Sequence, residues 1–155
     1  MNVELGCGSS KPDGYVGVDI RPFPGVDVVA DLTAGWPFKS SSLDSVRASH
    51  IFEHLPEPLH TMNELYRCLK PGSTAEIDVP SSNGMGAFQD PTHKSFWNVN
   101  SFIYYDRNQP LGGMYNCNKW DVLIAQEYNA VGMTQFGPYV KAHVRKPQDA
   151  CIESN

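Results

Sequence analysis

The chain has 155 residues, of which 41% are hydrophobic and 19% are charged. These proportions are typical of one folded globular domain, so we expect residues 1–155 to form a single domain and not a disordered chain. The formal net charge of −5 gives no general attraction to nucleic acid or anionic membranes, and no stretch approaches the ~20 apolar residues of a membrane span. Neither nucleic acid nor a membrane is therefore an expected partner.

The four cysteines are Cys7, Cys68, Cys117 and Cys151, and they are widely spread along the chain. A zinc or redox motif would bring two of them together as a Cys-x-x-Cys pair, which is absent from the sequence. The N-terminal residues also lack a secretory signal pattern. We therefore expect four reduced thiols in a cytoplasmic protein.

The first predicted strand, residues 2–6, leads into a glycine turn that contains Gly6 and Gly8. Glycine lets the backbone approach a ligand closely because it has no Cβ. The second predicted strand, residues 15–20, carries Asp19 near its end, and a carboxylate there can accept hydrogen bonds from both hydroxyls of a ribose. Ligands of open parallel sheets lie beyond the carboxyl ends of the strands, so the pattern predicts a nucleoside site.

Between Gly8 and Tyr15 there are only six residues, and they include Pro12 and Gly14. A crossover between parallel strands normally takes a dozen or more residues and contains a helix. We therefore expect the helix after the glycine turn to be absent or reduced to one turn.

The next elements are a third strand at residues 26–30, which leads to Asp31, and a fourth at 43–49. Pro56 or Pro58 suits the first turn of a helix, and Lys70-Pro71-Gly72 is expected to end that helix. The apolar residues of its predicted buried face are Leu59, Met62, Leu65, Tyr66 and Leu69.

Three more strands are predicted, at residues 74–79, 120–125 and 138–144. This order predicts an α/β fold with a mostly parallel sheet, an abbreviated helix complement and an antiparallel C-terminal strand. Polar residues alternate with apolar ones in these strands, which is unlike a sheet buried on both faces. We expect one thinly covered face, shielded by a second copy of the chain, as in a homodimer, or by the C-terminal segment.

Five short segments occur in an order that resembles a class I S-adenosylmethionine-dependent methyltransferase, in particular its small Glu-His-Leu branch. The segments are Glu4-Leu5-Gly6-Cys7-Gly8, Val18-Asp19-Ile20, Ala30-Asp31-Leu32, Ser49-His50-Ile51-Phe52-Glu53-His54-Leu55 and Leu69-Lys70-Pro71-Gly72. The resemblance covers about residues 1–80 and implies a Rossmann-like domain, truncated in its helices. It also implies S-adenosylmethionine as the cofactor, bound mainly by residues 1–80, with residues 81–155 on the acceptor side.

The resemblance implies a cofactor site formed by Glu4, Gly6, Cys7, Gly8, Asp19, Ile20, Asp31, Leu32, Ser49 and His50. Asp19 would bind the ribose and Asp31 the adenine amino group. Glu4 would face the α-amino group of the cofactor, directly or through water. Ser49 and His50 would lie under the sulfonium and the methionine moiety.

Asp90-Pro91-Thr92-His93 resembles a loop that borders the acceptor pocket in related small methyltransferases. His93 could take a proton from an acceptor hydroxyl or amine, since imidazole titrates near neutral pH. A structural hydrogen-bonding role for His93 is the alternative. The acceptor is expected to be a small molecule, which the sequence does not identify.

Two other functions remain open from the sequence. One is a non-catalytic module that binds S-adenosylmethionine or another nucleoside. The other is a zinc metallohydrolase using His50-x-x-Glu53-His54, with Glu127 as a third ligand, which requires an α-helix through residues 50–54. Pro56 and Pro58 follow at once and leave room for barely one helical turn, which disfavours the zinc site. The methyltransferase interpretation assigns no metal ligand. A dehydrogenase is disfavoured because the third glycine of its fingerprint is absent.

Overall fold

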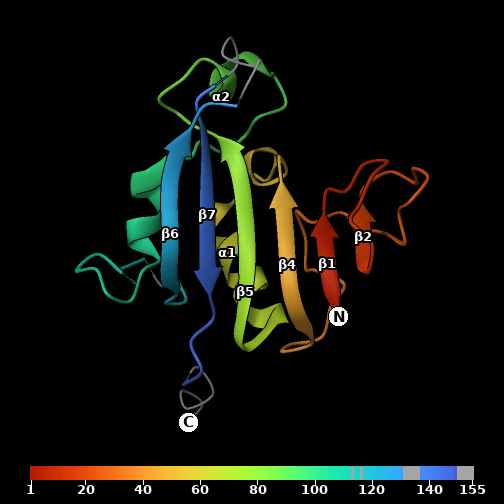
Figure 1. The fold of residues 1–155 in the computed structure, drawn as a ribbon, viewed down its shortest axis with the longest axis horizontal. Coiled ribbons are helices and arrows are strands. Elements are labelled where there is room, and N and C mark those ends of the chain that lie inside the picture. Colours follow the sequence, from red (N-terminus) through yellow and green to blue (C-terminus); the bar gives the residue numbers. More distant parts are fainter. Residues whose placement is uncertain (113, 116, 131–136, 150–155) are drawn as a thin grey trace.

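The computed structural model describes residues 1–112, 114–115, 117–130 and 137–149, so Cys151 lies outside the described residues. The strands form a single sheet with the order β3-β2-β1-β4-β5-β7-β6, in which Figure 1 labels every strand except β3. In chain order the strands are β1 (Asn2–Leu5), β2 (Tyr15–Asp19), β3 (Val28–Val29), β4 (Leu43–Ser49), β5 (Leu69–Pro80), β6 (Asp121–Tyr128) and β7 (Tyr139–Arg145).

Strands β3, β2, β1, β4 and β5 are parallel, whereas β7 lies antiparallel between β5 and β6. The arrow of β7 accordingly points against its neighbours in Figure 1. This confirms the predicted mostly parallel sheet with an antiparallel C-terminal strand. The carboxyl ends of β1 to β5 meet at one edge, which is where ligands of open α/β sheets bind.

Helical segments are short and few: η1 (Phe52–His54), α1 (Pro58–Cys68), α2 (Gly86–Gln89) and η2 (Val99–Tyr104). Turns and extended residues join β1 to β2, so the predicted absence of a helix there is confirmed. Within the described residues, none of the helices has the length and hydropathy that crossing a membrane would require.

Helix α1 begins at Pro58, one of the two predicted start positions, and ends at Cys68. The backbone is already extended at Leu69, where β5 starts. Lys70-Pro71-Gly72 therefore lies inside β5, and the prediction that this segment ends the helix was wrong. Strand β5 is correspondingly longer than the predicted strand at residues 74–79.

The apolar core lies between one face of the sheet and α1. Val3, Leu5 and Val46 of the sheet and Met62 and Leu65 of α1 are each at most 1% exposed. Burial of these side chains is the main stabilising contribution that holds α1 against the strands.

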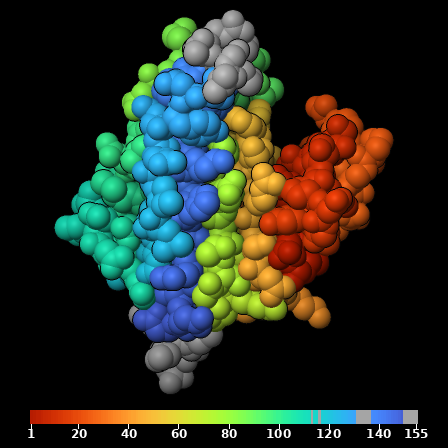
Figure 2. All heavy atoms as spheres, viewed as in Figure 1, coloured from red at the N-terminus to blue at the C-terminus, as the bar shows by residue number. Residues whose placement is uncertain are grey.

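Polar side chains line the opposite face of the sheet, over which Figures 1 and 2 show no described helix. Arg47 lies beside Glu4, with 3.6 Å between Nη1 and Oε2. Further along the same row, Glu76 pairs with His143 at 3.1 Å and with Lys141 at 3.5 Å. The predicted thinly covered face is therefore present, and its cover by a second copy or by the C-terminal segment stays a prediction.

Candidate functional site

A tight bend at Gly6 and Gly8 follows the carboxyl end of β1. Both glycines have left-handed backbone conformations, with φ of +63° and +54°. Gly6 is also crowded, because a Cβ built there would lie 2.7 Å from the Cβ of Ile51. Position 6 therefore requires glycine for its conformation and for its space, whereas position 8 requires it for conformation alone.

The Asp19 carboxylate at the end of β2 points toward this bend. Its Oδ2 accepts a hydrogen bond from the Gly8 N–H at 2.9 Å, and its Oδ1 accepts one from the Arg21 N–H at 3.0 Å. Each carboxylate oxygen has a second lone-pair direction, so both can accept a further hydrogen bond. The backbone thus orients Asp19 without exhausting its capacity to bind a ligand.

A cavity of about 310 Å³, called here the first cavity, opens at this edge of the sheet. Its lining residues are Gly6, Asp19, Ile20, Ala30, Asp31, Leu32, Thr33, Ile51, His54, Leu55 and Lys94. Most of them follow the carboxyl ends of β1, β2, β3 and β4. The first cavity therefore occupies the position at which an open parallel sheet binds its ligand.

Three further predicted residues line the first cavity beside Asp19. Asp31 is fixed by Thr33, whose backbone N–H and hydroxyl donate to Oδ1 at 2.9 and 2.7 Å. These hydrogen bonds hold the pKa of Asp31 below its usual value, and the backbone hydrogen bond is the larger cause. Leu32 is buried, and Ile20 is 61% exposed.

Four predicted cofactor residues do not line either this cavity or the next one. Burial raises the pKa of Glu4, which lies beside Arg47 on the open sheet face. Cys7 is also buried, which raises the pKa of its thiol. Gly8 contributes its N–H to Asp19, and Ser49 ends β4 opposite Asp78 of β5.

A second cavity, also of about 310 Å³, adjoins the first one at His54, which lines both. The second cavity is lined by His50, Glu53, His54, Pro80, Gly86, Gln89, Asp90, His93 and Tyr139. His50 has a left-handed backbone with φ of +54° and lies 3.3 Å from Glu53, Nδ1 to Oε1. This contact raises the pKa of His50.

His93 is held beside η1 by its own loop and by α2. The backbone N–H groups of Lys94 and Ser95 both donate to the carbonyl of Glu53, at 2.7 and 3.0 Å. The His93 Nδ1 lies 2.9 Å from the Ala87 carbonyl, which can only accept a hydrogen bond. The proton of neutral His93 is therefore on Nδ1, and Nε2 keeps a free lone pair.

Part of the chain resembles a known protein family. Residues 3–77 match the family model of a methyltransferase domain. This match and the Rossmann-like sheet support a class I S-adenosylmethionine-dependent methyltransferase. The comparison with curated protein sequences found no match to the chain.

Solved structures share the methyltransferase fold at low sequence identity. One is a complex of the Haloferax volcanii Trm112 methyltransferase activator with a protein proposed to be a methyltransferase, at 17% identity and a TM-score of 0.70, covering 94% of this chain and 81% of that chain. Another is a Methanosarcina mazei S-adenosylmethionine-dependent methyltransferase, at 15% identity and a TM-score of 0.64, covering 94% of this chain and 92% of that one.

A third similar structure is the Burkholderia thailandensis 1,6-didemethyltoxoflavin-N1-methyltransferase, with bound 1,6-didemethyltoxoflavin and S-adenosylhomocysteine. It is 11% identical with a TM-score of 0.65, covering 94% of this chain and 70% of that chain. At such identities the likeness establishes a shared fold alone.

The α-helix required by the zinc-hydrolase alternative is not found at residues 50–54. Residue 50 is left-handed, and only Phe52–His54 are helical, in a single 3₁₀ turn. His50 and His54 are therefore not one α-helical turn apart. Glu127, the suggested third ligand, instead accepts hydrogen bonds from Ser81 and Asn83.

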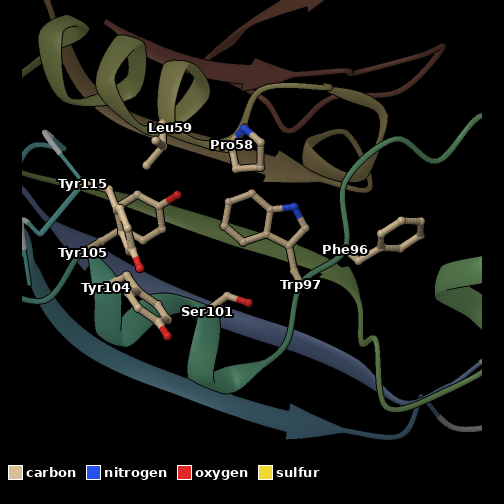
Figure 3. A pocket seen from close by; sticks show the side chains of 8 residues that line it. All are labelled: Pro58, Leu59, Phe96, Trp97, Ser101, Tyr104, Tyr105 and Tyr115. Carbon is tan, nitrogen blue, oxygen red and sulfur yellow. The ribbon is translucent and has the colours of Figure 1, made fainter. Parts of the chain in front are cut away.

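A third, aromatic cavity of about 290 Å³ lies between the start of α1 and η2 of the methyltransferase domain (Figure 3). It is lined by Pro58, Leu59, Phe96, Trp97, Ser101, Tyr104, Tyr105 and Tyr115. Leu59, predicted to be buried, is 40% exposed because it borders this cavity. Since the cavity does not share a lining residue with the other two, it is not part of the candidate site.

Sequence reasoning missed several residues of the first cavity. Ile51, His54 and Leu55 belong to the Ser49–Leu55 segment that carried the resemblance, but only Ser49 and His50 of that segment were assigned to the cofactor site. Extending the assignment to the end of that segment would have found them. Lys94 had no such signal, because it reaches the cavity only through the contact of its loop with η1.

Proposed function

We propose that this methyltransferase domain binds S-adenosylmethionine in the first cavity and transfers its methyl group to a small molecule in the second cavity. The observation that carries the proposal is the junction of the two cavities at His54. Asp19 lines one cavity and His93 the other. Transfer of a group between two molecules requires two adjoining sites of this kind.

The residues of the first cavity fit a nucleoside. Asp19 points into the ligand position with lone pairs to spare, so it can accept hydrogen bonds from the two ribose hydroxyls. Asp31 is held ionised by Thr33 and can accept from the adenine amino group. Ile20 and Leu32 would supply apolar contacts to the base.

The methionine part of the cofactor would extend toward the junction of the cavities. Gly6 lines the first cavity, so the backbone of Gly6 and Cys7 would pass close to this part of the cofactor. His50 lines the adjoining cavity at the end of β4, directly after Ser49. A contact between Glu4 and the α-amino group remains part of the proposal.

When bound, S-adenosylmethionine would supply an electrophilic methyl group attached to a positively charged sulfur. The protein would contribute mainly by holding the nucleophile in line with that methyl group in a closed pocket. Carboxylates against the sulfur would stabilise the ground state more than the transition state, because the charge is lost during transfer. Asp19 and Asp31 are therefore better used at the ribose and adenine.

His93 is the proposed catalytic residue. Its Nδ1–H donates to Ala87, which leaves the Nε2 lone pair available to accept a proton from an acceptor hydroxyl or amine. Its side chain is 7% exposed and lines the second cavity. This position suits a base that acts on an acceptor bound next to the cofactor.

Calorimetry with S-adenosylmethionine and S-adenosylhomocysteine, against NAD and ATP, tests the cofactor assignment. We expect binding of the first two ligands only, and a loss of binding in Asp19→Asn and Asp19→Ala. Asp13→Asn, an exposed position outside both cavities, is the matched control and should bind normally. Equal binding of all four ligands, or none, would refute the assignment.

Turnover separates an enzyme from a non-catalytic binding module. A panel of small hydroxyl and amine acceptors is incubated with the cofactor, and release of S-adenosylhomocysteine is measured. We expect turnover with at least one acceptor and a large loss of it in His93→Gln, with cofactor binding retained. Cofactor binding without turnover of any acceptor would favour the binding module.

A further inference from the structure

Three side chains of the second cavity converge as metal ligands would. Glu53, His54 and His93 each present one ligand atom, and these atoms all lie within 4.8 Å of one another. Glu53 is 2% exposed, and its buried Oε2 has no hydrogen-bond partner among the described residues. Its Oε1 lies 3.3 Å from His50 Nδ1, but a buried carboxylate oxygen without a partner is costly, so Oε2 is suited to accept a further donor or to bind a cation.

The two imidazoles are oriented for coordination through Nε2. His54 Nδ1 lies 3.3 Å from the carbonyl of Thr92, and His93 Nδ1 lies 2.9 Å from that of Ala87. A carbonyl can only accept, so both Nδ1 atoms carry the proton and both Nε2 atoms keep a lone pair. Histidines that bind metals characteristically donate their other N–H to a backbone carbonyl in this way.

The chain holds these residues together through contacts between two distant segments. Ser95 Oγ donates to the Phe52 carbonyl at 2.8 Å and accepts from Trp97 Nε1 at 2.9 Å. Thr92 Oγ1 lies 3.1 Å from His54 Nδ1, and the His54 and His93 ring centroids are 4.9 Å apart. The cluster is thus supported by an anchored loop and is not a chance meeting of mobile side chains.

We propose that Glu53, His54 and His93 form a binding site for a divalent transition-metal cation of the Zn²⁺ type. Zinc bonds of roughly 2.0–2.1 Å place tetrahedral ligand atoms about 3.3 Å apart, so the side chains would close by about 1.5 Å at most. Three protein ligands leave one coordination position open, toward the cavity that the three residues line.

The ligand set selects the class of cation. Two imidazoles and one carboxylate suit zinc, iron and related metals, whereas Mg²⁺ and Ca²⁺ prefer oxygen ligands. Asp90 adds a nearby negative charge, with Oδ2 3.8 Å from His93 Nε2. This site differs from the sequence-predicted His50-x-x-Glu53-His54 set, since His93 replaces His50 and no α-helix is needed.

The inference deepens the proposed function, on which its catalytic meaning rests. The open position would take a water or an acceptor hydroxyl, whose pKa a bound cation lowers. In the metal-bound protein His93 would hold the cation instead of accepting a proton. The cation would lower the pKa of the coordinated acceptor hydroxyl, and its proton would leave to solvent water. The second cavity would then favour acceptor molecules that carry a hydroxyl group.

The test uses the untagged full chain, stripped with a chelator and desalted. Titration with ZnCl₂ in a calorimeter should show one equivalent bound per chain, and Co²⁺ should produce visible ligand-field absorption. His54→Gln and His93→Gln should each weaken Zn²⁺ binding by more than the ~10–100-fold that loss of a second-shell partner costs. His60→Gln, a histidine outside the cavity, should bind as the wild type does.

Absence of stoichiometric binding by the wild type, or unchanged binding by both histidine variants, would overturn the proposal. Circular dichroism verifies that each variant is folded, and if one unfolds the other carries the test. Titration of the stripped protein with S-adenosylmethionine separates the two proposals. Cofactor binding without Zn²⁺ binding would overturn the metal site alone, whereas Zn²⁺ binding without cofactor binding would overturn the proposed function.

Discussion

The first and second cavities each contain an Asp-x-Thr turn with the same hydrogen bonds, but different parts of the chain hold the two turns in place. In Asp31-Leu32-Thr33 the threonine N–H and hydroxyl donate to the aspartate Oδ1, at 2.9 and 2.7 Å. In Asp90-Pro91-Thr92 the corresponding distances are 2.8 and 2.7 Å. Each turn fixes itself, because a short polar side chain satisfies backbone and hydroxyl donors two residues later.

The surroundings of the two turns are not alike. Asp31 follows β3, and the first cavity is formed mainly by segments that follow adjacent parallel strands. Asp90 lies on a loop that reaches its site only through hydrogen bonds from Lys94 and Ser95 to η1. The first cavity thus depends on strand order, whereas the second depends on contacts between distant segments.

Gly6→Ala should have the largest effect, because it strains the backbone and overlaps Ile51 at the first cavity. We expect the free energy of unfolding to fall by about 2–4 kcal/mol, together with loss of S-adenosylmethionine binding. Urea denaturation and calorimetry measure the two effects.

Two other glycines separate the effect of backbone strain from that of the overlap with Ile51. Gly8 has a positive φ but no atom within 4 Å of a built Cβ, so Gly8→Ala should cost about 1–2 kcal/mol. Gly35 has neither restriction, and Gly35→Ala should leave the urea midpoint nearly unchanged. If Gly6→Ala and Gly8→Ala cost the same, the contact with Ile51 does not limit this bend.

Ser95→Ala should be next, since it removes the anchor of the second cavity. The change leaves the Phe52 carbonyl without its donor and the buried Trp97 Nε1 without its acceptor. We expect a loss of about 2–3 kcal/mol in the free energy of unfolding. Zn²⁺ binding should weaken as well, while the affinity for S-adenosylmethionine stays near that of the wild type.

The matched control is Ser42→Ala, which removes an exposed hydroxyl that donates to the Lys39 carbonyl. It should change the stability by less than about 0.5 kcal/mol. A Ser95→Ala protein that loses cofactor affinity as strongly as Zn²⁺ affinity would show that the two cavities are not independently supported.

The sequence predicted the first cavity better than the second, because the first cavity depends on strand order and the second on contacts between distant segments. Gly6, Asp19 and Asp31 lie near strand ends, and the carboxyl ends of parallel strands must meet at one edge. Predicting the strands was therefore enough to bring these residues together. The Gly8–Asp19 hydrogen bond shows that the carboxylate indeed points toward the bend.

The partners of His93 and Glu4 were not predictable in this way. His93 was expected near the acceptor, but its proximity to Glu53 depends on backbone contacts that no local pattern encodes. Glu4 faces Arg47 across neighbouring strands, a pairing that follows from the strand register and not from the motif that contains Glu4. Its predicted cofactor role therefore still awaits a binding experiment.

Glu64→Gln should have an intermediate, pH-dependent effect on the free energy of unfolding, because Glu64 supports the wall of the first cavity. Glu64 accepts from Arg67 Nε and from the Trp36 N–H, both at 2.7 Å, and Trp36 Nε1 donates to the Leu32 carbonyl at 3.2 Å. We expect a loss of about 1–2 kcal/mol at neutral pH. Urea denaturation across pH measures it.

The sign of the pH effect follows from the Arg67 guanidinium, which holds the pKa of Glu64 below its ordinary value of 4.5. The stabilisation is complete above that unfolded-state value and is lost as the pH falls through the lower folded-state pKa. Wild type and Glu64→Gln should therefore converge in strongly acidic solution. Glu57→Gln is the control, because the Glu57 side chain makes no capping hydrogen bond at the start of α1, and it should be as stable as the wild type at neutral pH.

Thr33→Val and Thr92→Val should have the smallest effects and should compare the two turns directly. Each variant removes the hydroxyl and keeps the threonine backbone N–H bond to the aspartate. Hydrogen bonds from the threonine are the largest causes of the lowered pKa of both Asp31 and Asp90, and the hydroxyl lies 2.7 Å from Oδ1 in each turn. Carboxyl NMR titration should therefore show an upward pKa shift in Asp31 of Thr33→Val and in Asp90 of Thr92→Val. An upward shift in only one of the two aspartates would mean that the local turn does not control the charge of the other.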